Sequence, residues 1–163
     1  MNGKRRSHVA RYAVAQPAHV KTTPAGRKPG WSIGDGMMGP GIFVYIAEDD
    51  EAVRSALRLI LKKRPALVVS GEAENWTALL NLVRNASPNL LLLDWELPGL
   101  PIPGWRERLD ALNPGAKVVA LSGRPEAAAQ ALASGAHAFT SKAEPPEKLV
   151  ETIRGMVPTY TRP

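Results

Sequence analysis

The sequence predicts an α/β fold: a doubly wound, five-stranded parallel sheet with helices on both faces, in three layers. Two observations predict it. Short apolar segments alternate with helix-type patterns from residue 42 to residue 157, and the third of these segments, residues 90–93, is apolar at every position. A strand that is apolar throughout is typical of a parallel sheet covered on both faces. Regular alternation of strands and helices builds such a sheet through right-handed crossovers.

The five predicted strands are short apolar runs bounded by polar segments. They cover residues 42–46, 67–69, 90–93, 117–121 and 138–140. In a sheet of this kind ligands bind where the carboxyl ends of the strands meet, so the polar residues that follow each strand are the candidates for a functional site.

The helices are predicted from apolar residues at helical spacing and from signals at the helix ends. Asp50 is a capping residue for the first helix, whose pattern stops before Pro65, and Asn75 is a plausible cap for the second. Gly135 follows the fourth helix as a natural C′ residue. The second to fifth helices are expected near residues 75–86, 104–112, 125–134 and 149–157.

The composition excludes several kinds of site. The chain of 163 residues has no cysteine, which excludes disulfides, thiolate metal sites and cysteine nucleophiles. Hydrophobic residues make up 44% of it, enough for a core. Apolar runs such as residues 90–93 are far too short to span a membrane. We therefore expect a cytoplasmic protein without membrane contact.

Residues 1–41 differ from the remainder in charge and composition. This segment holds seven of the 21 basic residues and one of the 15 acidic residues, and it is rich in Pro and Gly without apolar periodicity. Residues 42–163 are therefore neutral, and the net charge of +6 arises in residues 1–41. Because such a segment buries too little apolar surface to offset its ordering entropy, we expect it to be disordered.

Three interpretations of this extension stay open. It could be a basic arm that contacts nucleic acid or anionic lipid, or an organellar transit peptide. We favour an unstructured or misassigned N-terminus, with translation starting at Met37 or Met38. The predicted domain division is a basic extension at 1–41, the folded domain at 42–158 and a short tail at 159–163.

Charged and hydroxyl residues follow four of the five predicted strands. The run 48–50 (Glu-Asp-Asp) follows the first strand, Asp94 the third, Ser122 the fourth and Lys142 the fifth. Carboxylates gathered at one edge repel one another unless a cation lies among them. Mg²⁺ prefers carboxylates, a carbonyl and water as ligands, so the pattern predicts a magnesium site.

Four segments resemble, in order, the motifs of a known family: VYIAEDD at 44–50, LLLDWELPG at 91–99, VVALSG at 118–123 and GAHAFTSK at 135–142. They resemble the receiver domain of two-component response regulators, over residues 42–157. The LSGRPE and KAEPPE patterns are similar to the NarL/LuxR-type branch of that family. The resemblance implies a flavodoxin-like fold with strand order 2-1-3-4-5.

The resemblance also implies a metal-assisted phosphoacceptor. Asp94 would be the nucleophile that becomes an aspartyl phosphate. Glu48, Asp49 and Asp94 would hold Mg²⁺ together with the backbone carbonyl of Glu96, and the ion would offset repulsion between the carboxylate and the phosphoryl oxygens. Asp50 is interpreted as a helix cap rather than a ligand.

A phosphate partner and a switch are implied in the same way. Lys142 would pair with the phosphate, and Ser122 would donate a hydrogen bond to a phosphate oxygen. Ser122 and Phe139 resemble the switch pair of the family, in which the hydroxyl moves toward the phosphate and the ring turns inward. One departure is Ala143, since many receivers have proline after this lysine.

Other residues near these motifs are expected either to modulate the lifetime of the phosphoaspartate or to have structural roles. Glu96 and Arg124 each lie two positions beyond a site residue, and they could pair across the site and slow hydrolysis of the phosphoaspartate. His137 is interpreted as structural rather than as a phosphodonor or ligand. Packing roles are expected for three tryptophans, Trp76, Trp95 and Trp105.

The function predicted from the sequence is that of a stand-alone receiver. The phosphodonor would be a histidine kinase or a histidine phosphotransfer protein, and the chain would not be a turnover enzyme beyond its own Mg²⁺-dependent phosphorylation and dephosphorylation. The printed sequence ends at Pro163 without room for a helix-turn-helix domain, so no sequence-specific DNA binding is expected. A monomer or weak dimer would pass the signal to a protein through the face formed by helix four, strand five and helix five.

Two other classes of function compete with this one. A pseudo-receiver would bind partners without phosphorylation, but it would have no need for the acids, Asp94, Ser122 and Lys142 together. A phosphatase of the haloacid dehalogenase type has its nucleophile in an Asp-x-Asp motif, whereas residue 96 is Glu. We expect no turnover of small phosphoesters.

Overall fold

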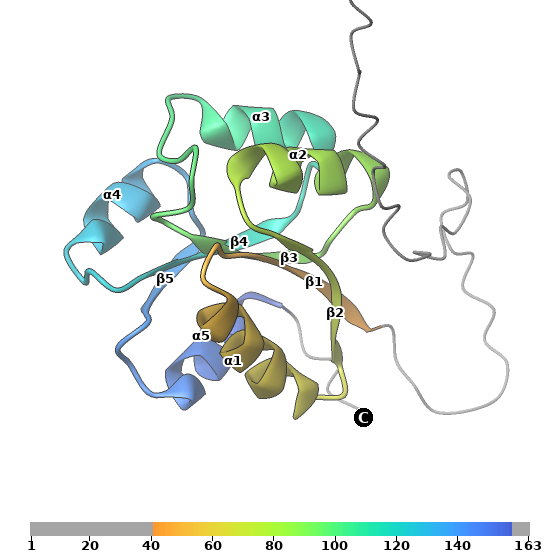
Figure 1. Cartoon of the computed structure of the whole chain (residues 1–163), viewed down its shortest axis with the longest axis vertical. Coiled ribbons are helices and arrows are strands. Elements are labelled where there is room, and N and C mark those ends of the chain that lie inside the picture. Colours follow the sequence, from red (N-terminus) through yellow and green to blue (C-terminus); the bar gives the residue numbers. More distant parts are fainter. Residues whose placement is uncertain (1–40, 158–163) are drawn as a thin grey trace, which may run out of the picture. The chain divides into compact units, whose positions relative to one another are not determined.

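A computed structural model describes residues 41–157 (Figure 1). Two predicted segments lie outside the described residues: the tail at 159–163 and the extension at 1–41, of which only residue 41 is described. The described part alternates strands and helices in this order: β1 Ile42–Ala47, α1 Glu51–Lys62, β2 Leu67–Ala73, α2 Trp76–Asn85, β3 Leu90–Asp94, α3 Trp105–Leu112, β4 Lys117–Ser122, α4 Ala127–Ala133, β5 Ala138–Ser141 and α5 Pro146–Met156.

The five strands form one sheet in the order β2-β1-β3-β4-β5. Every neighbouring pair is parallel. The predicted α/β class, the doubly wound parallel sheet and the strand order are therefore confirmed. The order reverses beside β1 and β3, so the carboxyl ends of these two strands flank the switch point where sheets of this type bind ligands.

Helices cover both faces of the sheet and create two cores. On one face, buried residues of α2, α3 and α4 pack against the sheet in a core that includes Trp76, Trp95 and Trp105. On the other face, α1 and α5 contribute Leu57, Leu61, Leu149 and Ile153. Figure 1 shows α2 and α3 on the opposite side of the sheet from α1 and α5. Because β3 is central and covered on both faces, all of its residues are buried.

The predicted helix-end residues act as expected. The side chain of Asp50 accepts hydrogen bonds from the backbone N–H groups of Ala52 (2.8 Å) and Val53 (3.2 Å), and that of Asn75 accepts one from Ala78 N–H (2.9 Å). Both side chains satisfy donors that a first helical turn leaves unpaired. Gly135 has φ +114°, the left-handed conformation expected of a residue that ends a helix.

The second strand is longer than predicted. It extends to Ala73, beyond the apolar run at 67–69, and its extra residues are Ser70, Gly71, Glu72 and Ala73. An edge strand does not need to be apolar on both faces, so the apolar pattern underestimates its length. The backbone register shifts beside Tyr45, and a Cβ on Gly71 would lie 2.9 Å from the Tyr45 ring, so glycine is required at this close approach.

Among residues 41–157, no helix combines the length and the apolar character that crossing a membrane would require.

His137 lies just before β5 and joins it to β4. Its Nδ1 accepts the N–H of Val118 (3.0 Å), while its own backbone N–H donates to Val118 O (2.9 Å). The accepting Nδ1 must be unprotonated. Burial lowers the pKa of His137, and the nearby charges of Arg106 and Lys117 lower it further, against a smaller opposing effect of Asp110.

We expect acid to destabilise the protein through His137. Because its folded-state pKa is depressed, the unfolded chain binds more protons as the pH falls through the ordinary histidine range near about 6.5. The unfolding free energy therefore falls with decreasing pH until the folded-state pKa is passed. His137→Asn retains an acceptor but does not titrate. Between about pH 7.5 and about pH 5, the urea midpoint of this variant should therefore fall less than that of wild type. Equal falls in both proteins would contradict this role.

Candidate functional site

The predicted acidic residues meet at the carboxyl ends of β1 and β3. Carboxylate oxygens of Glu48, Asp49 and Asp94 lie within 4.8 Å of one another. Glu48 and Asp94 are each 1% exposed, whereas Asp49 is exposed. The parallel arrangement produces this proximity, since the adjacent strands β1 and β3 both end at this edge.

Lys142 joins two of these carboxylates. It follows β5, and its backbone N–H donates to Ser122 O (2.8 Å), which fixes the loop beside β4. Its Nζ lies 2.8 Å from Glu48 Oε2 and 2.9 Å from Asp94 Oδ1. The ion pair is largely buried, with 23% of the lysine side chain exposed. Desolvated pairs of this kind are retained only where both partners have good geometry.

The loop after Lys142 has a defined structure without a proline at position 143. The N–H of Ser141 donates to Glu144 Oε2 (2.9 Å), and the N–H of Ala143 donates to Ser141 Oγ (3.2 Å). These two side chains supply bonds on both sides of the lysine. The departure at Ala143 therefore leaves the ammonium within reach of both buried carboxylates.

Burial dominates the protonation of this site. It raises the pKa of Asp94 to about 6, although Lys142 and the N–H of Glu96 oppose the shift, and the charge of Glu48 adds to it. Burial alone would lower the pKa of Lys142, but the hydrogen bonds to Glu48 and Asp94 outweigh it and raise that pKa. Near neutral pH, Asp94 is therefore ionised and Lys142 is charged.

The charges and donor atoms of the site fit a divalent cation. Three carboxylates and one ammonium carry a net charge of −2, which a bound Mg²⁺ would balance. Hard oxygen donors gathered within 4.8 Å are the ligands that Mg²⁺ prefers. Glu48 Oε2 is buried, and among the described residues its close polar partner is Lys142 Nζ at 2.8 Å, so this oxygen has a lone pair available for a second partner. Glu48, Asp49 and Asp94 would hold the ion.

Ser122 and Glu96 form a second cluster beside Asp94. Ser122 Oγ donates to Glu96 Oε1 (2.7 Å), and Arg124 Nε donates to the same oxygen (3.0 Å). The N–H of Glu96 also donates to Asp94 Oδ1 (3.1 Å), which places this residue at the site. Burial would raise the pKa of Glu96, but hydrogen bonds from Ser122 and Arg124 outweigh it and lower that pKa.

Phe139 lies in β5, which β4 separates from Asp94 at the end of β3. It is half-buried and packs against the core beneath α2, α3 and α4, opposite Ala120 of β4. Ser122 is fully buried at the end of β4. The structure therefore places both predicted switch residues on neighbouring strands, two register positions apart.

The sequence patterns missed one charged residue beside the site. Arg54 of α1 is 6% exposed, and its NH1 donates to the backbone carbonyl of Glu48 (2.6 Å). A signal was present, because Arg54 falls three positions before Leu57 and seven before Leu61, on the buried face of α1. A basic residue in such an apolar stripe requires buried acceptors.

Comparisons with known proteins agree with this geometry. Residues 44–154 match the family model described as the response regulator receiver domain. BvgA, a transcription regulator of virulence factors in Bordetella pertussis, is 31% identical over 120 residues, which cover 72% of this chain and 57% of BvgA. The chain thus spans little more than half the length of such curated relatives.

Solved structures show the same fold. The receiver domain of the response regulator NarL from Mycobacterium tuberculosis aligns with TM-score 0.64 and 24% identity, covering 72% of this chain and 96% of that one. A chain from the complex of CheY6 with the P1 domain of CheA3 from R. sphaeroides aligns with TM-score 0.60 and 27% identity, covering 72% and 98%. Since the family model spans more than half of the sequence, the chain belongs to the response regulator receiver domain family.

Proposed function

We propose that the chain accepts a phosphoryl group on Asp94 in a two-component relay and switches a protein-binding surface in response. One observation carries the proposal: the buried Asp94 carboxylate lies 2.9 Å from Lys142 Nζ and shares a 4.8 Å cluster with Glu48 and Asp49. Such a cluster of buried acids with a single ammonium is costly for the stability of the fold, and costly clusters of this kind are typical of functional sites.

The proposed reaction is attack by a carboxylate oxygen of Asp94 on the phosphorus of a phosphohistidine. An O–P bond forms while the N–P bond breaks, and the imidazole leaves with the bonding electron pair and takes up a proton. A bound Mg²⁺ would neutralise charge on the phosphoryl oxygens. Lys142, already 2.9 Å from Asp94, would pair with the new phosphate and stabilise the negative charge on it.

Phosphorylation would then change the partner of Ser122. Its hydroxyl donates to Glu96 in the described state (2.7 Å), so it must leave that carboxylate to donate to a phosphate oxygen. Movement of the hydroxyl would give Phe139 space to turn inward. The consequence would be a changed face around α4, β5 and α5, where Leu132 is 47% exposed and available for a protein contact.

The donor is proposed to be a histidine kinase or a histidine phosphotransfer protein in the cytoplasm. The likeness to a chain of the CheY6–CheA3 P1 complex supports a partner of that kind. The output partner is proposed to be a protein that binds the switched face. We propose that the chain acts as a monomer or weak dimer.

Phosphorylation by acetyl phosphate tests the proposal without a kinase. Wild type in Mg²⁺ should gain the mass of one phosphoryl group, and chelation of the metal should prevent the gain. Asp94→Asn should gain nothing, because the amide is not a nucleophile at neutral pH. Asp50→Asn is the matched control, since Asp50 caps α1 and is not among the clustered acids. A wild type that gains no mass would indicate a pseudo-receiver.

Glu96 and Arg124 are proposed to prolong the phosphorylated state. Their side chains lie 3.0 Å apart beside Asp94 and could restrict the hydrolytic water. We expect Glu96→Ala and Arg124→Ala to shorten the phosphoaspartate half-life by roughly threefold or more, a barrier change of about 0.7 kcal/mol. Glu107→Ala, on the exposed surface of α3, is the control. If both variants keep the wild-type half-life, the idea is abandoned.

A further inference from the structure

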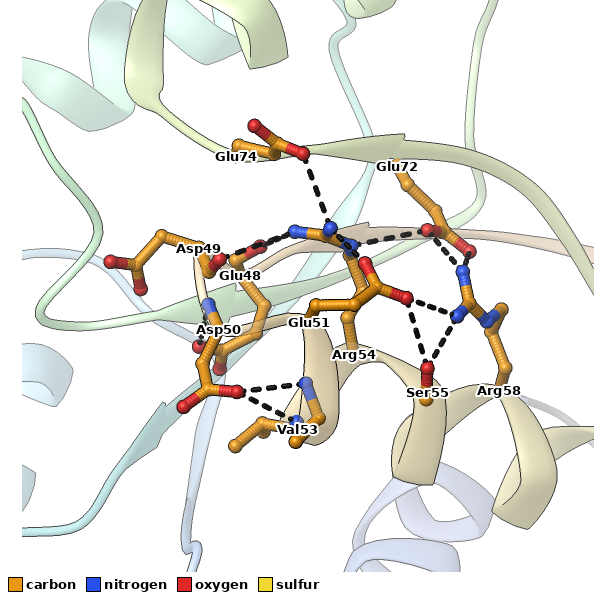
Figure 2. Close-up of polar contacts among 11 residues, drawn as sticks. Glu48, Asp49, Asp50, Glu51, Val53, Arg54, Ser55, Arg58, Glu72 and Glu74 are labelled. Atoms are coloured by element: carbon orange, nitrogen blue, oxygen red, sulfur yellow. Dashed lines mark hydrogen bonds and ion pairs between the residues drawn. The ribbon is translucent and has the colours of Figure 1, made fainter.

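A cluster of charged residues surrounds the buried side chain of Arg54 in α1. Figure 2 shows its guanidinium between the β1–α1 turn, the end of β2 and the first turn of α1. Only 7% of the side chain is exposed. A buried guanidinium requires both acceptors and countercharges, since an unpaired one would be strongly destabilising.

One end of the guanidinium holds the backbone of the acidic turn. NH1 donates to Glu48 O (2.6 Å) and lies 3.5 Å from Asp49 O. The N–H of Glu48 in turn donates to Ala73 O (2.9 Å). The two peptide groups that flank the Cα of Glu48 are therefore both held, and the second of them leads directly into Asp49. These backbone contacts set the direction in which Glu48 and Asp49 project.

Glutamates outside the site neutralise the rest of the guanidinium. Nε lies 3.3 Å from Glu72 Oε2, and NH2 contacts Glu74 Oε1 (3.2 Å) and Glu51. Arg54 is thus surrounded by acids that do not belong to the metal cluster. Its charge is compensated locally, so it can hold the turn without acting as a counterion that competes with the metal.

Arg58 provides an internal comparison. It lies one turn further along α1, pairs with Glu72 (2.8 Å) and Glu51 (2.7 Å), and makes no hydrogen bond to the carbonyl of Glu48 or Asp49. The two arginines share acidic partners and differ in contact with the site.

We propose that Arg54 is a positioning residue for the magnesium site: it holds the carbonyls of Glu48 and Asp49 and so pre-orients two of the three carboxylates. The inference rests on the proposed function, because it assigns Mg²⁺ to this cluster. Partners that orient metal ligands typically contribute roughly 10- to 100-fold to metal affinity. Arg54 acts through the turn and touches neither the metal nor the phosphoryl group.

The test measures Mg²⁺ binding by calorimetry on the metal-free full chain. We expect Arg54→Lys, which retains the charge and most of the aliphatic stem, to weaken Mg²⁺ binding roughly tenfold or more. Arg58→Lys should stay within about twofold of wild type, because it leaves the carbonyl contacts intact. Acetyl phosphate labelling of Arg54→Lys should recover at saturating Mg²⁺, which a loss of the phosphoacceptor would not allow.

Far-UV circular dichroism and urea midpoints accompany each titration, so that a loss of fold is separated from a loss of metal ligands. If Arg54→Lys fails to fold, Arg54→Met, which retains most of the stem without the charge, takes its place. Wild-type Mg²⁺ affinity in the folded Arg54 variant, or equal weakening by Arg58→Lys, would overturn the inference while leaving the phosphoacceptor proposal intact. A wild type that neither binds Mg²⁺ nor takes up phosphate would overturn both.

Discussion

Replacing Lys142 with methionine is expected to destabilise the metal-free protein by about 3 kcal/mol near neutral pH, because removing one partner of a buried ion pair leaves an uncompensated charge. Two carboxylates would lose their shared cation, since Lys142 Nζ lies 2.8 Å from Glu48 and 2.9 Å from Asp94, both almost fully buried. Methionine retains the aliphatic volume of the side chain, so packing changes little.

Magnesium should restore much of that stability. The ion would replace the missing positive charge among the carboxylates, and a ligand that binds only the folded state stabilises it by mass action. Urea unfolding of Lys142→Met with and without Mg²⁺ measures both effects. Lys148→Met is the control, because Lys148 is 55% exposed and its nearest acid, Glu151, lies 3.9 Å away. A Lys142→Met variant that is as stable as wild type, and whose stability does not change with Mg²⁺, would contradict the electrostatic account of the site.

Trp95→Ala is expected to lower the free energy of unfolding by about 3–5 kcal/mol. Trp95 is 1% exposed and packs edge-to-face on Trp105, with ring centroids 5.8 Å apart and an interplanar angle of 79°. The backbone N–H of Trp95 also donates to Leu121 O (2.7 Å), so the residue after Asp94 joins β3 to β4. Alanine would leave a large cavity that rigid neighbouring strands cannot fill.

Leu132→Ala is the matched comparison for this prediction. Leu132 is 47% exposed on α4, so its removal should change stability by less than about 1 kcal/mol. Guanidinium chloride titrations of both variants give the difference directly. If Trp95→Ala loses no more stability than Leu132→Ala, the tryptophan cluster does not support the site in the way the packing indicates.

The fold could be predicted from the sequence because the apolar patterns and the helix-capping residues indicated the same elements. The uninterrupted apolar run of β3 and the caps Asp50 and Asn75 each indicated the element that the structure contains. The length of β2 could not be read in this way. Its final residues are polar or small because an edge strand is less covered. Gly71 leaves room for the Tyr45 ring, which a Cβ at this position would contact too closely.

The site was predictable to the level of which residues meet, but not how they are bonded. Strand ends bring Glu48, Asp49, Asp94 and Lys142 together for topological reasons. The hydrogen bond from Ser122 to Glu96 depends on side-chain rotamers, which sequence spacing does not specify. Arg54 was missed for a related reason: a charged residue on a helix is usually solvated, and only the three-dimensional packing supplies its buried acceptors.

The most direct test of the central claim is chemical mapping of the phosphoryl group after transfer from a phosphorylated histidine kinase encoded in the same genome. Borohydride reduction converts an aspartyl phosphate to homoserine, which peptide mass spectrometry locates. The account predicts homoserine at position 94 in Mg²⁺, and none in metal-free buffer or in Asp94→Asn. Transfer to another residue, or undiminished transfer to Asp94→Asn, would contradict it.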